Sequence, residues 1–424
     1  MIKIIKYEKE NETQIFSRGA DPINVSDVVS EILNNVKVNK DSALKFYCEK
    51  FDKVILNDIE VSKEEIDEAY NLIDKKLLET IVKAEKNIRF FHEKQKRDGF
   101  RVEKENGVIL GQKITAIENV GLYVPGGTAS YPSTVLMDAV PAKIAGCNNI
   151  IMVTPPMRNG KINPAILVAA KTAGVDRIFK ISGAQAIGAL AYGTESVPKV
   201  DKIVGPGNIY VAEAKRQVFG IVAIDVIAGP SEILIVADGN NNPKHIACDL
   251  LSQAEHDKMA SAVLVTDSMD FAKKVQVEIE NQLKDLSREE IARGSIDNNG
   301  KIIVTDNIEK AIDISNAVAP EHLELCLENP FDYLDKVTNA GSIFLGKNCP
   351  EALGDYFAGP NHTLPTNGCA RFSSPLSVDD FIKKTQYIYY TAEALNEVCF
   401  DVETFAKAEG LTAHAKSAVI RSEK

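Results

Sequence analysis

The sequence predicts an α/β protein with two Rossmann-like parallel-sheet domains and small helical segments at both ends. Continuous apolar runs such as "NNIIMV" and "AVLV" alternate with helical segments from about residue 119 onward. This alternation is the signature of parallel sheets that are covered by helices on both faces. The 424 residues also exceed the roughly 250–300 at which a single core stops growing. We therefore expect two α/β blocks, before and after about residue 235, rather than one large sheet.

The first hundred residues read as helical. The stretches "VSDVVSEILNNV" and "SKEEIDEAYNLIDKKLLETIVKAEKNIRFFHEKQ" place apolar residues at helical spacing, with charges between them. We interpret this region as an amphipathic packing scaffold.

Four strand-and-helix units follow, and we assign them to one α/β domain. Their expected strands are "VGLYVPGG", "NNIIMVTPP", "DRIFKISG" and "VDKIVGPG", and an apolar helical stretch follows each one.

After the segment "AIDVIAGPSEILIVADG" the alternation resumes and predicts a second block. Its later strands are expected at "SAVLVTD", "KIIVTD", "HLELCL" and "GSIFLG", and the segment from about residue 376 reads as helical with no strand signal. The expected organisation is an N-terminal segment, a first α/β domain in two pieces, a second α/β domain and a C-terminal helical segment, at 1–22, 23–119 with 235–375, 120–234, and 376–424.

Composition narrows the class of protein. The net charge of −11 argues against a nucleic-acid-binding surface, which needs a concentrated basic face. The opening "MIKIIKYEKENETQ" turns charged too early for a signal peptide, and no apolar run reaches the roughly 18 residues of a membrane span. Seven scattered cysteines without a C-x-x-C pair suit reduced thiols. We expect a cytoplasmic protein without a nucleic-acid or membrane partner.

Four turns are rich in glycine or proline: "VPGG" (124–127), "ISGAQ" (181–185), "VGPGN" (204–208) and "IAGPSE" (227–232). Small residues at the carboxyl ends of parallel strands let a ligand approach closely, and helix N-termini there favour phosphates. None of the turns matches G-x-G-x-x-G, and singly each is more often a tight turn than a ligand loop. Four of them on one sheet favour a nucleotide or phosphate cleft.

The stretch "DLLSQAEHD" places Gln253 and His256 three residues apart, on one face of a helix. An amide oxygen and an imidazole nitrogen on one face can be two of the ligands of a metal such as zinc. The same pattern fits a polar helix end with His256 near the C-terminal dipole. Spacing alone leaves both readings open.

Three further segments carry polar chemistry. "APEHLEL" sets Glu321 beside His322 at a helix-to-strand transition, where an imidazole is the natural base near neutral pH, although such pairs are also common on surfaces. "GDYFAGPNHTLPT" holds Asp355 and His362 in an irregular loop, and "AEGLTAHAKSA" holds Glu409 and His414 in what would otherwise be a solvated tail.

Taken together, these blocks resemble the histidinol dehydrogenase family. The resemblance runs over nearly the whole chain and is densest from about residue 108 to His414. It rests on eight blocks in order: "GLYVPGG…YPSTVLM", "SGAQAIGALAYGT", "VDKIVGPGN", "AGPSEILIVAD", "DLLSQAEHD", "APEHLEL", "GDYFAGPNHTLPT" and "AEGLTAHAKSA".

The resemblance implies an activity and a set of site residues. Members oxidise L-histidinol to L-histidinal and then to L-histidine, with two NAD and one Zn²⁺ per subunit. The implied zinc ligands are Gln253, His256, Asp355 and His414. The implied acid/base pair is Glu321 and His322. The implied substrate contacts are Ser231, His362 and Glu409, together with Gln253, His256, His322, Asp355 and His414. The implied NAD contacts are Tyr123, Gln185 and Asn208.

The resemblance also implies a domain-swapped homodimer, in which the C-terminal segment reaches into the partner's active site. We expect His322 to remove the hydroxyl proton while hydride leaves for NAD, and Glu321 to activate water for hydration of the aldehyde. The alternatives are a related zinc and NAD dehydrogenase for another small alcohol, and a zinc-binding relative without catalysis. His362 and Glu409 favour a substrate that carries an imidazole and an amine. A zinc hydrolase fits poorly, because the chain has no H-E-x-x-H.

Overall fold

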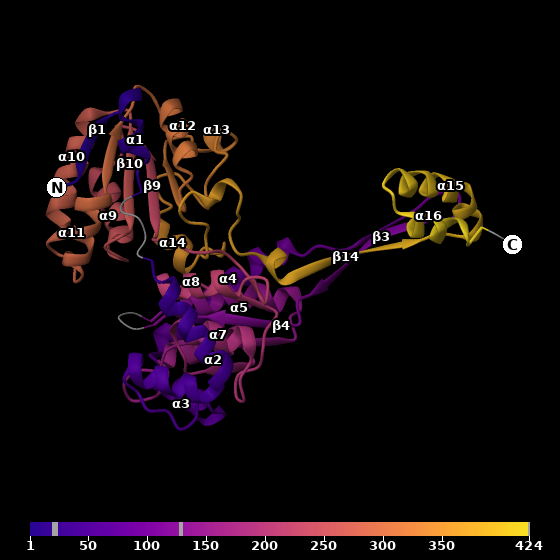
Figure 1. Cartoon of the computed structure of the whole chain (residues 1–424). Helices are drawn as coiled ribbons and strands as arrows, with labels where there is room; N and C mark the ends of the chain where they lie inside the picture. Colours follow the sequence, from indigo (N-terminus) through magenta and orange to yellow (C-terminus); the bar gives the residue numbers. More distant parts are fainter. Residues whose placement is uncertain (19–23, 127–129, 423–424) are drawn as a thin grey trace. The chain divides into compact units, whose positions relative to one another are not determined.

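The computed structural model describes residues 1–18, 24–126 and 130–422. The chain forms two compact units, one of Met1–Gln95 with Glu118–Phe381 and one of Lys96–Ile117 with Ile382–Lys424. The first unit contains two parallel sheets, and the second contains an antiparallel sheet with two helices (Figure 1).

The first parallel sheet has five strands in the order β6-β5-β4-β7-β8. These strands are β4 Asn119–Tyr123, β5 Asn149–Val153, β6 Arg177–Phe179, β7 Lys202–Val204 and β8 Ala223–Ile224. Around them lie α2 Ser26–Tyr47, α3 Lys63–Leu72, α4 Lys75–His92, α5 Pro132–Ala145, α6 Pro164–Ala173, α7 Gly183–Tyr192 and α8 Ile209–Val218.

Local signals in the sequence fix the ends of these helices. Pro132 and Pro164 begin α5 and α6, where the missing N–H has no helical partner in any case. Gly146 and Gly174 end the same two helices in the left-handed conformation that glycine adopts without strain. The connections from these helices to the next strands are therefore short: only residues 146–148 separate α5 from β5, and only residues 174–176 separate α6 from β6.

The second parallel sheet has six strands in the order β1-β11-β10-β9-β12-β13. They are β1 Lys3–Lys6, β9 Glu232–Ala237, β10 Ser261–Thr266, β11 Lys301–Val304, β12 His322–Cys326 and β13 Ser342–Leu345. The associated helices are α1 Glu12–Phe16, α9 Pro243–Ala254, α10 Met269–Leu283, α11 Glu289–Asn299, α12 Ile308–Val318, α13 Phe331–Leu334 and α14 Glu351–Tyr356. Helices α9 to α11 share one apolar core with the sheet, and α12 shares the core on the opposite face (Figure 1).

Both sheets have the same topology. Counted along the chain within each sheet, β4 to β8 and β9 to β13 are each arranged 3-2-1-4-5, and β1 adds an edge strand beside β11. Each sheet therefore has a switch point, where strand order reverses and ligands bind in open α/β sheets. In the six-stranded sheet Asn241 spans this point, because its Nδ2 donates to Asp238 Oδ1 at 2.9 Å and to the Cys326 carbonyl oxygen at 2.7 Å.

The second unit is built on the antiparallel sheet β14-β3-β2. Its elements are β2 Phe100–Glu103, β3 Ile109–Ala116, β14 Ile382–Tyr389, α15 Ala392–Ala408 and α16 Thr412–Val419. Tyr387 lies opposite Gly111 in the register, and its ring occupies the place that a side chain at Gly111 would need. The two helices pack against each other beyond the strands (Figure 1).

The predicted α/β class with parallel sheets is confirmed. The prediction that residues 376–424 contain no strand is wrong, because β14 runs for eight residues in this segment. Its side chains are almost all exposed, so backbone pairing with β3 holds the strand in place. For the same reason the sequence has no apolar run that would predict it. The N-terminal segment likewise contributes the short strand β1, which pairs with β11, so neither end is purely helical.

The expected grouping of residues 23–119 with 235–375 also differs from the packing. Helix α2 shares its apolar core with the five-stranded sheet and α7. Gly188 on α7 makes this possible, since a Cβ there would lie 3.1 Å from Leu33 Cδ2 and 3.3 Å from Val36 Cβ. Residues 96–117 belong to the second unit. The expected boundary between 1–22 and 23–119 falls within residues 19–23, outside the described part of the chain.

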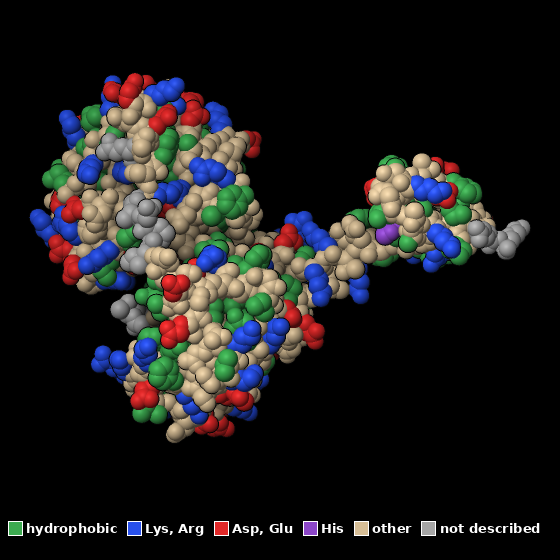
Figure 2. Space-filling view, in the orientation of Figure 1, with side chains coloured by type: hydrophobic (Ala, Val, Ile, Leu, Met, Phe, Trp, Pro, Cys, Tyr) green, Lys and Arg blue, Asp and Glu red, His purple; other side chains and the backbone are tan. Residues whose placement is uncertain are grey.

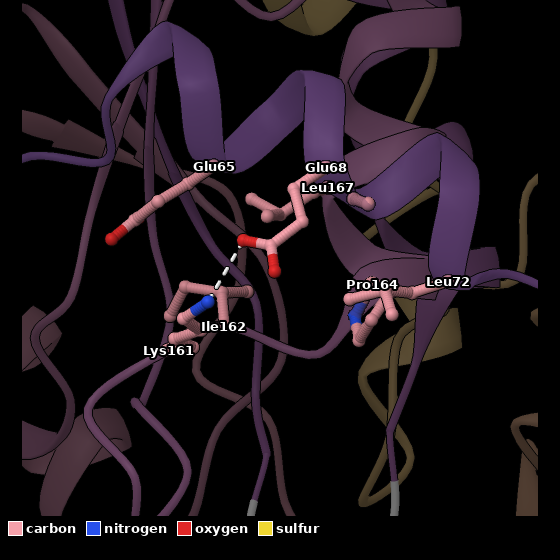
Figure 3. A pocket seen from close by; sticks show the side chains of 8 residues that line it. Glu65, Glu68, Leu72, Lys161, Ile162, Pro164 and Leu167 are labelled. Carbon is pink, nitrogen blue, oxygen red and sulfur yellow. Dashed lines mark hydrogen bonds and ion pairs between the residues drawn. The ribbon is translucent and has the colours of Figure 1, made fainter.

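Helices α3 and α6 enclose a narrow cavity on the five-stranded half of the first unit (Figure 3). Glu68 and Lys161 pair across it at 2.8 Å, and Glu65 and apolar side chains including Leu72 and Leu167 also line it. Its lining contains none of the expected site residues, so this cavity is a packing feature between two helices.

Over the described residues, no helix combines the length and the apolar composition needed to cross a membrane. Basic and acidic side chains are interspersed over the face drawn in Figure 2.

Candidate active site

Glu321 and His322 lie where α12 passes into β12. The helix ends at Val318, Ala319 adopts a left-handed conformation with φ 52°, and β12 starts at His322. The carbonyl oxygen of Glu321 accepts a hydrogen bond from Ser342 N at 2.9 Å. Both side chains are buried, with exposed fractions of 6% for Glu321 and 4% for His322.

The backbone of one residue, Glu232, orients both side chains. The backbone N–H of Glu232 donates to Glu321 Oε2 at 2.8 Å, and the Glu232 carbonyl oxygen accepts from His322 Nδ1 at 3.0 Å. A carbonyl oxygen can only accept, so the hydrogen of a neutral His322 ring resides on Nδ1. Nε2 then presents a lone pair, and it has no hydrogen-bond partner among the described residues.

Two more carboxylates face His322 from α14. Glu351 Oε1 lies 3.6 Å from Nδ1, and Asp355 Oδ1 lies 3.7 Å from Nε2. One ligand atom from each of His322, Glu351 and Asp355 lies within 4.8 Å of the other two. The site therefore gathers an imidazole and several carboxylates in a small buried volume.

Burial and charge act against each other on these groups. Burial alone lowers the pKa of His322, but Glu351, Glu321 and Asp355 outweigh it and raise that pKa well above 6.5. Burial raises the pKa of Glu321 to about 7 and that of Glu351 to about 8. Protons are therefore shared within the cluster near neutral pH.

Gln253 and His256 approach the same cluster from the end of α9. The Gln253 amide nitrogen donates to Glu351 Oε2 at 3.1 Å and to Oε1 at 2.5 Å. Its carbonyl oxygen is then the atom left to act as a ligand. Burial lowers the pKa of His256, against the opposing effect of Asp355. Three residues of the expected zinc set lie in the first unit: Gln253, His256 and Asp355. Gln253 bonds to Glu351 and His256 interacts with Asp355, so all three belong to the same cluster.

The loop after α14 is fastened to α5. His362 Nδ1 donates to the Asp355 carbonyl oxygen at 2.9 Å, and its Nε2 lies 3.3 Å from Thr134 Oγ1. Asn361 Nδ2 donates to the Met137 carbonyl oxygen at 2.6 Å. This loop therefore links the six-stranded half, which carries Asp355, to the five-stranded half, which carries α5.

Tyr123, Gln185 and Asn208 lie near the switch point of the five-stranded sheet. Tyr123 ends β4, its hydroxyl oxygen accepts from Gly183 N at 3.2 Å, and burial raises its pKa to about 12. Asn208 follows β7 and caps α8 through Tyr210 N and Val211 N. Gln185 lies in the first turn of α7. These positions suit a ligand that binds across the crevice between β4 and β7.

We expected all four Gly-rich turns on one sheet, and this is wrong. The turns at 181–185 and 204–208 follow strands β6 and β7 of the five-stranded sheet, whereas residues 227–232 lead into β9 at the amino end of the six-stranded sheet. Of the turn at 124–127, Gly127 lies outside the described residues. The fourth turn brings Ser231 and Glu232 to the side of the sheet where β12 starts at His322.

Glu409 and His414 belong to the second unit. Glu409 caps the C-terminus of α15, and His414 lies on α16, with both side chains exposed. The first unit alone therefore brings together Gln253, His256, Glu321, His322, Asp355 and His362.

Reasoning from the sequence missed Glu351 and Glu232. Glu351 lies four residues before Asp355 on α14, so the helical spacing of two carboxylates was an available signal. Glu232 acts through its backbone, which its identity does not reveal.

Comparisons with known proteins identify the family. A family model described as Histidinol dehydrogenase matches residues 17–422. The chain is 56% identical over 404 residues to "Histidinol dehydrogenase" of Clostridium acetobutylicum, covering 95% of this chain and 94% of that protein. It is 58% identical over 393 residues to the protein of the same name from Bacillus thuringiensis subsp. konkukian, covering 93% and 91%.

Solved structures give the same result. The crystal structure of histidinol dehydrogenase from Elizabethkingia anophelis superposes with a TM-score of 0.95 at 42% identity and covers 99% of this chain and 98% of that one. An acetylating aldehyde dehydrogenase from Geobacillus thermoglucosidasius gives a TM-score of 0.51 at 13% identity, covering 87% of this chain and 99% of that one, a likeness of fold alone. The chain belongs to the histidinol dehydrogenase family.

Proposed function

We propose that this chain carries out both oxidations in one site, from L-histidinol to L-histidinal and on to L-histidine. Family membership already makes it an NAD-dependent oxidoreductase of histidine biosynthesis that acts on histidinol. The observation that carries the finer proposal is the buried His322, whose Nδ1 is bonded to Glu232 and whose Nε2 has no hydrogen-bond partner among the described residues, beside the buried Glu321.

In the first oxidation, His322 Nε2 takes the hydroxyl proton as the carbinol carbon loses hydride. In the second, Glu321 takes a proton from the water that adds to the aldehyde, and the protonated His322 returns its proton to the aldehyde oxygen, which gives the gem-diol. The neutral His322 then takes a hydroxyl proton from the gem-diol as the carbon loses a second hydride. When bound, NAD supplies the acceptor for the hydride in each oxidation. His322 must be neutral at the start of each oxidation. The carboxylates around it oppose this, because they stabilise its protonated form. A cation at Asp355 would weaken that opposition.

We assign NAD binding to Tyr123, Gln185 and Asn208. Their place at the ends of β4 and β7 and in the first turn of α7 supports the assignment, because helix N-termini and a switch point suit a dinucleotide. The buried Tyr123 hydroxyl also ties the end of β4 to the start of α7.

We assign zinc to Gln253, His256 and Asp355, with His414 as the fourth ligand. The donor set fits the ion, since it combines an amide oxygen, two imidazoles and one carboxylate. Bound there, zinc would supply a positive charge that orients the imidazole and the amine of histidinol. The cluster of His322, Glu351 and Asp355 is the other group of potential ligands. We prefer the first set because the proposed mechanism requires His322 as a base.

We assign Ser231, His362 and Glu409 to substrate contacts. Ser231 precedes Glu232, whose backbone N–H and carbonyl oxygen bond to the two proposed catalytic side chains. Because Glu409 and His414 are exposed on the second unit, we propose that each site of a domain-swapped homodimer receives these two residues from the partner.

The test is the yield of NADH from a limiting amount of L-histidinol, with and without a chelator. We expect two NADH for each histidinol and loss of turnover after chelation, restored by Zn²⁺. A single NADH for each histidinol, or turnover that ignores the chelator, would contradict the proposal. Measuring zinc content separates the ligand sets: Gln253→Ala should lose the ion, whereas Glu351→Gln should retain it.

A related dehydrogenase for another small alcohol is the alternative function. An amino alcohol that lacks the imidazole serves as the discriminating substrate. We expect little turnover of it, and a preference for it over histidinol would favour the alternative.

A further inference from the structure

We propose that Arg18 is a positioning residue for Glu321 and His322, acting through Glu232 and the C-terminal end of α12. The inference rests on the proposed function, since that function makes Glu321 and His322 the catalytic pair. Arg18 lies more than 200 residues before Glu232 in sequence and was not among the expected site residues.

The backbone of Glu232 is the common support of the catalytic pair. Its N–H donates to Glu321 and its carbonyl oxygen accepts from His322, so a shift of the backbone at this residue moves both side chains. Glu232 is the first residue of β9, where the ladder to β12 begins with the pair Ile233 and His322. Pairing with β12 therefore fixes the backbone that follows Glu232. The side chain of Glu232 supplies a further constraint on its position.

That side chain is buried and bonded to Arg18. Arg18 Nη1 lies 2.5 Å from Glu232 Oε1, and the Glu232 side chain is only 8% exposed. Burial raises the pKa of Glu232, and Arg18 is the main influence that lowers it. Without the guanidinium, a buried carboxylate would remain unpaired beside Glu321, an arrangement that favours movement of the side chain toward water.

The same guanidinium also holds the helix that leads to Glu321. Arg18 Nη2 donates to the carbonyl oxygen of Val318, the last residue of α12. Arg371 Nη2 donates to the preceding carbonyl, that of Ala317. Gly368, at φ +74°, lies against both arginines: a Cβ there would approach Arg18 Nη2 at 3.2 Å. Arg18 thus joins the strand beside the catalytic pair to the helix before it.

Only arginine can make both contacts at once. Its planar fork presents two nitrogens in a fixed geometry, whereas the ammonium of lysine is a single point charge. Arg371 offers a matched control, because it bonds to the end of the same helix but, within the described part of the chain, to the Gly368 carbonyl oxygen rather than to Glu232. An effect specific to Arg18 would therefore report on the link to Glu232.

The experiment compares zinc-loaded Arg18→Ala, Arg18→Lys and Arg371→Ala with the wild type. The readouts are kcat and KM for L-histidinol and L-histidinal, zinc content and the thermal midpoint. We expect Arg18→Ala to lower kcat about 10- to 100-fold with KM changed less than about threefold, because misplacement of catalytic groups slows the reaction more than it weakens binding. Millimolar guanidinium should restore part of the rate of Arg18→Ala but none of that of His322→Asn.

Arg18→Lys retains the charge and covers the case in which the alanine variant does not fold. We expect it to lose several-fold in kcat at an unchanged zinc content, and Arg371→Ala to stay within about twofold of the wild type. Wild-type kcat in Arg18→Lys, or equal losses in the two arginine-to-alanine variants, would overturn the inference. Full activity in His322→Asn would instead refute the proposed function, so the two failures are distinguishable.

Discussion

At the scale of single residues, the neighbours of His322 decide what its imidazole can do. The Glu232 carbonyl selects the nitrogen that carries the hydrogen, and three carboxylates increase the affinity of the ring for a proton. A base that works twice in one catalytic cycle must be reset between steps, and nearby carboxylates can take part in that reset.

Replacing His322 with asparagine should abolish both oxidations. The asparagine amide can still donate to Glu232, but it cannot accept a proton from the substrate. We expect a loss of about 10²- to 10⁴-fold in kcat for histidinol and for histidinal, measured as NADH formation. His245→Asn is the matched control, because His245 is an exposed histidine in the first turn of α9. A His322→Asn variant that oxidises histidinol at the wild-type rate would contradict the assigned role.

Replacing Glu321 with glutamine should separate the two steps. The amide oxygen can still accept from Glu232 N–H, so the local structure persists, but the side chain can no longer take a proton from water. We expect the oxidation of histidinal to fall by at least about tenfold more than that of histidinol. The yield of NADH per histidinol should then drop below two at early times. Equal losses in both steps would show that Glu321 has no separate role in hydration.

At the scale of elements, α5 and α8 enclose a buried charged network behind the site. Lys215 on α8 pairs with Asp225, which also accepts from Gly205 N at 2.8 Å. Asp138 on α5 accepts from Thr363 Oγ1 at 3.1 Å, and burial raises its pKa well above 3.8. The positive charge of Lys215 balances the carboxylate of Asp225 and leaves none for Asp138. Asp138 therefore retains its proton in the folded protein.

This proton makes stability depend on pH in a definite direction. Unfolded Asp138 loses its proton above about pH 4, whereas the folded protein retains it until its higher pKa, so its contribution falls as pH rises. Asp138→Asn removes that dependence and keeps an oxygen for Thr363. Relative to the wild type, we expect it to gain stability between pH 5 and pH 7, by at most about 1.4 kcal/mol per pH unit, measured by urea unfolding.

The control for this prediction is Asp225→Asn, which leaves buried Lys215 without its partner. It should lose about 3–5 kcal/mol of stability at neutral pH. An Asp138→Asn variant whose stability relative to the wild type does not change between pH 5 and pH 7 would show that Asp138 is ionised in the folded state.

The elements that the sequence predicted well are the buried ones, because a buried strand requires a run of apolar residues. Strands β5 and β10 are buried on both faces and read as apolar runs. Strand β14 is exposed along nearly its whole length, and β1 has only four residues, so neither shows such a run. The partners of α2 could not be predicted either, because an amphipathic face does not specify which sheet it covers.

The part of the candidate site that could be predicted is the part made by side chains whose chemical type suggests a role. His322 and Asp355 come together as expected. The roles of the Glu232 backbone and of Arg18 depend on long-range geometry, which spacing in the sequence does not contain.

At the scale of the whole molecule, the proposed sharing of active sites between two subunits predicts complementation between two inactive variants. Dimers formed from His322→Asn and His414→Asn chains would contain one site with both changes and one intact site. After co-expression we expect about a quarter of wild-type activity, because about half of the dimers are mixed and each has one working site. Each variant expressed alone is the control. No recovery in verified mixed dimers would show that His322 and His414 act within the same subunit.

Asn241 shows that the two sheets, although alike in topology, have been put to different uses. In one, the gap between the central strands is bordered by glycine turns and by residues that we assign to a dinucleotide. In the other, the chain closes the corresponding gap itself, with a single amide bridging Asp238 and Cys326. The two sheets thus share a topology but differ in where they offer a site. The five-stranded sheet leaves its crevice to the ligand that we propose, whereas the six-stranded sheet bridges its crevice and carries Glu321 and His322 at the amino end of β12.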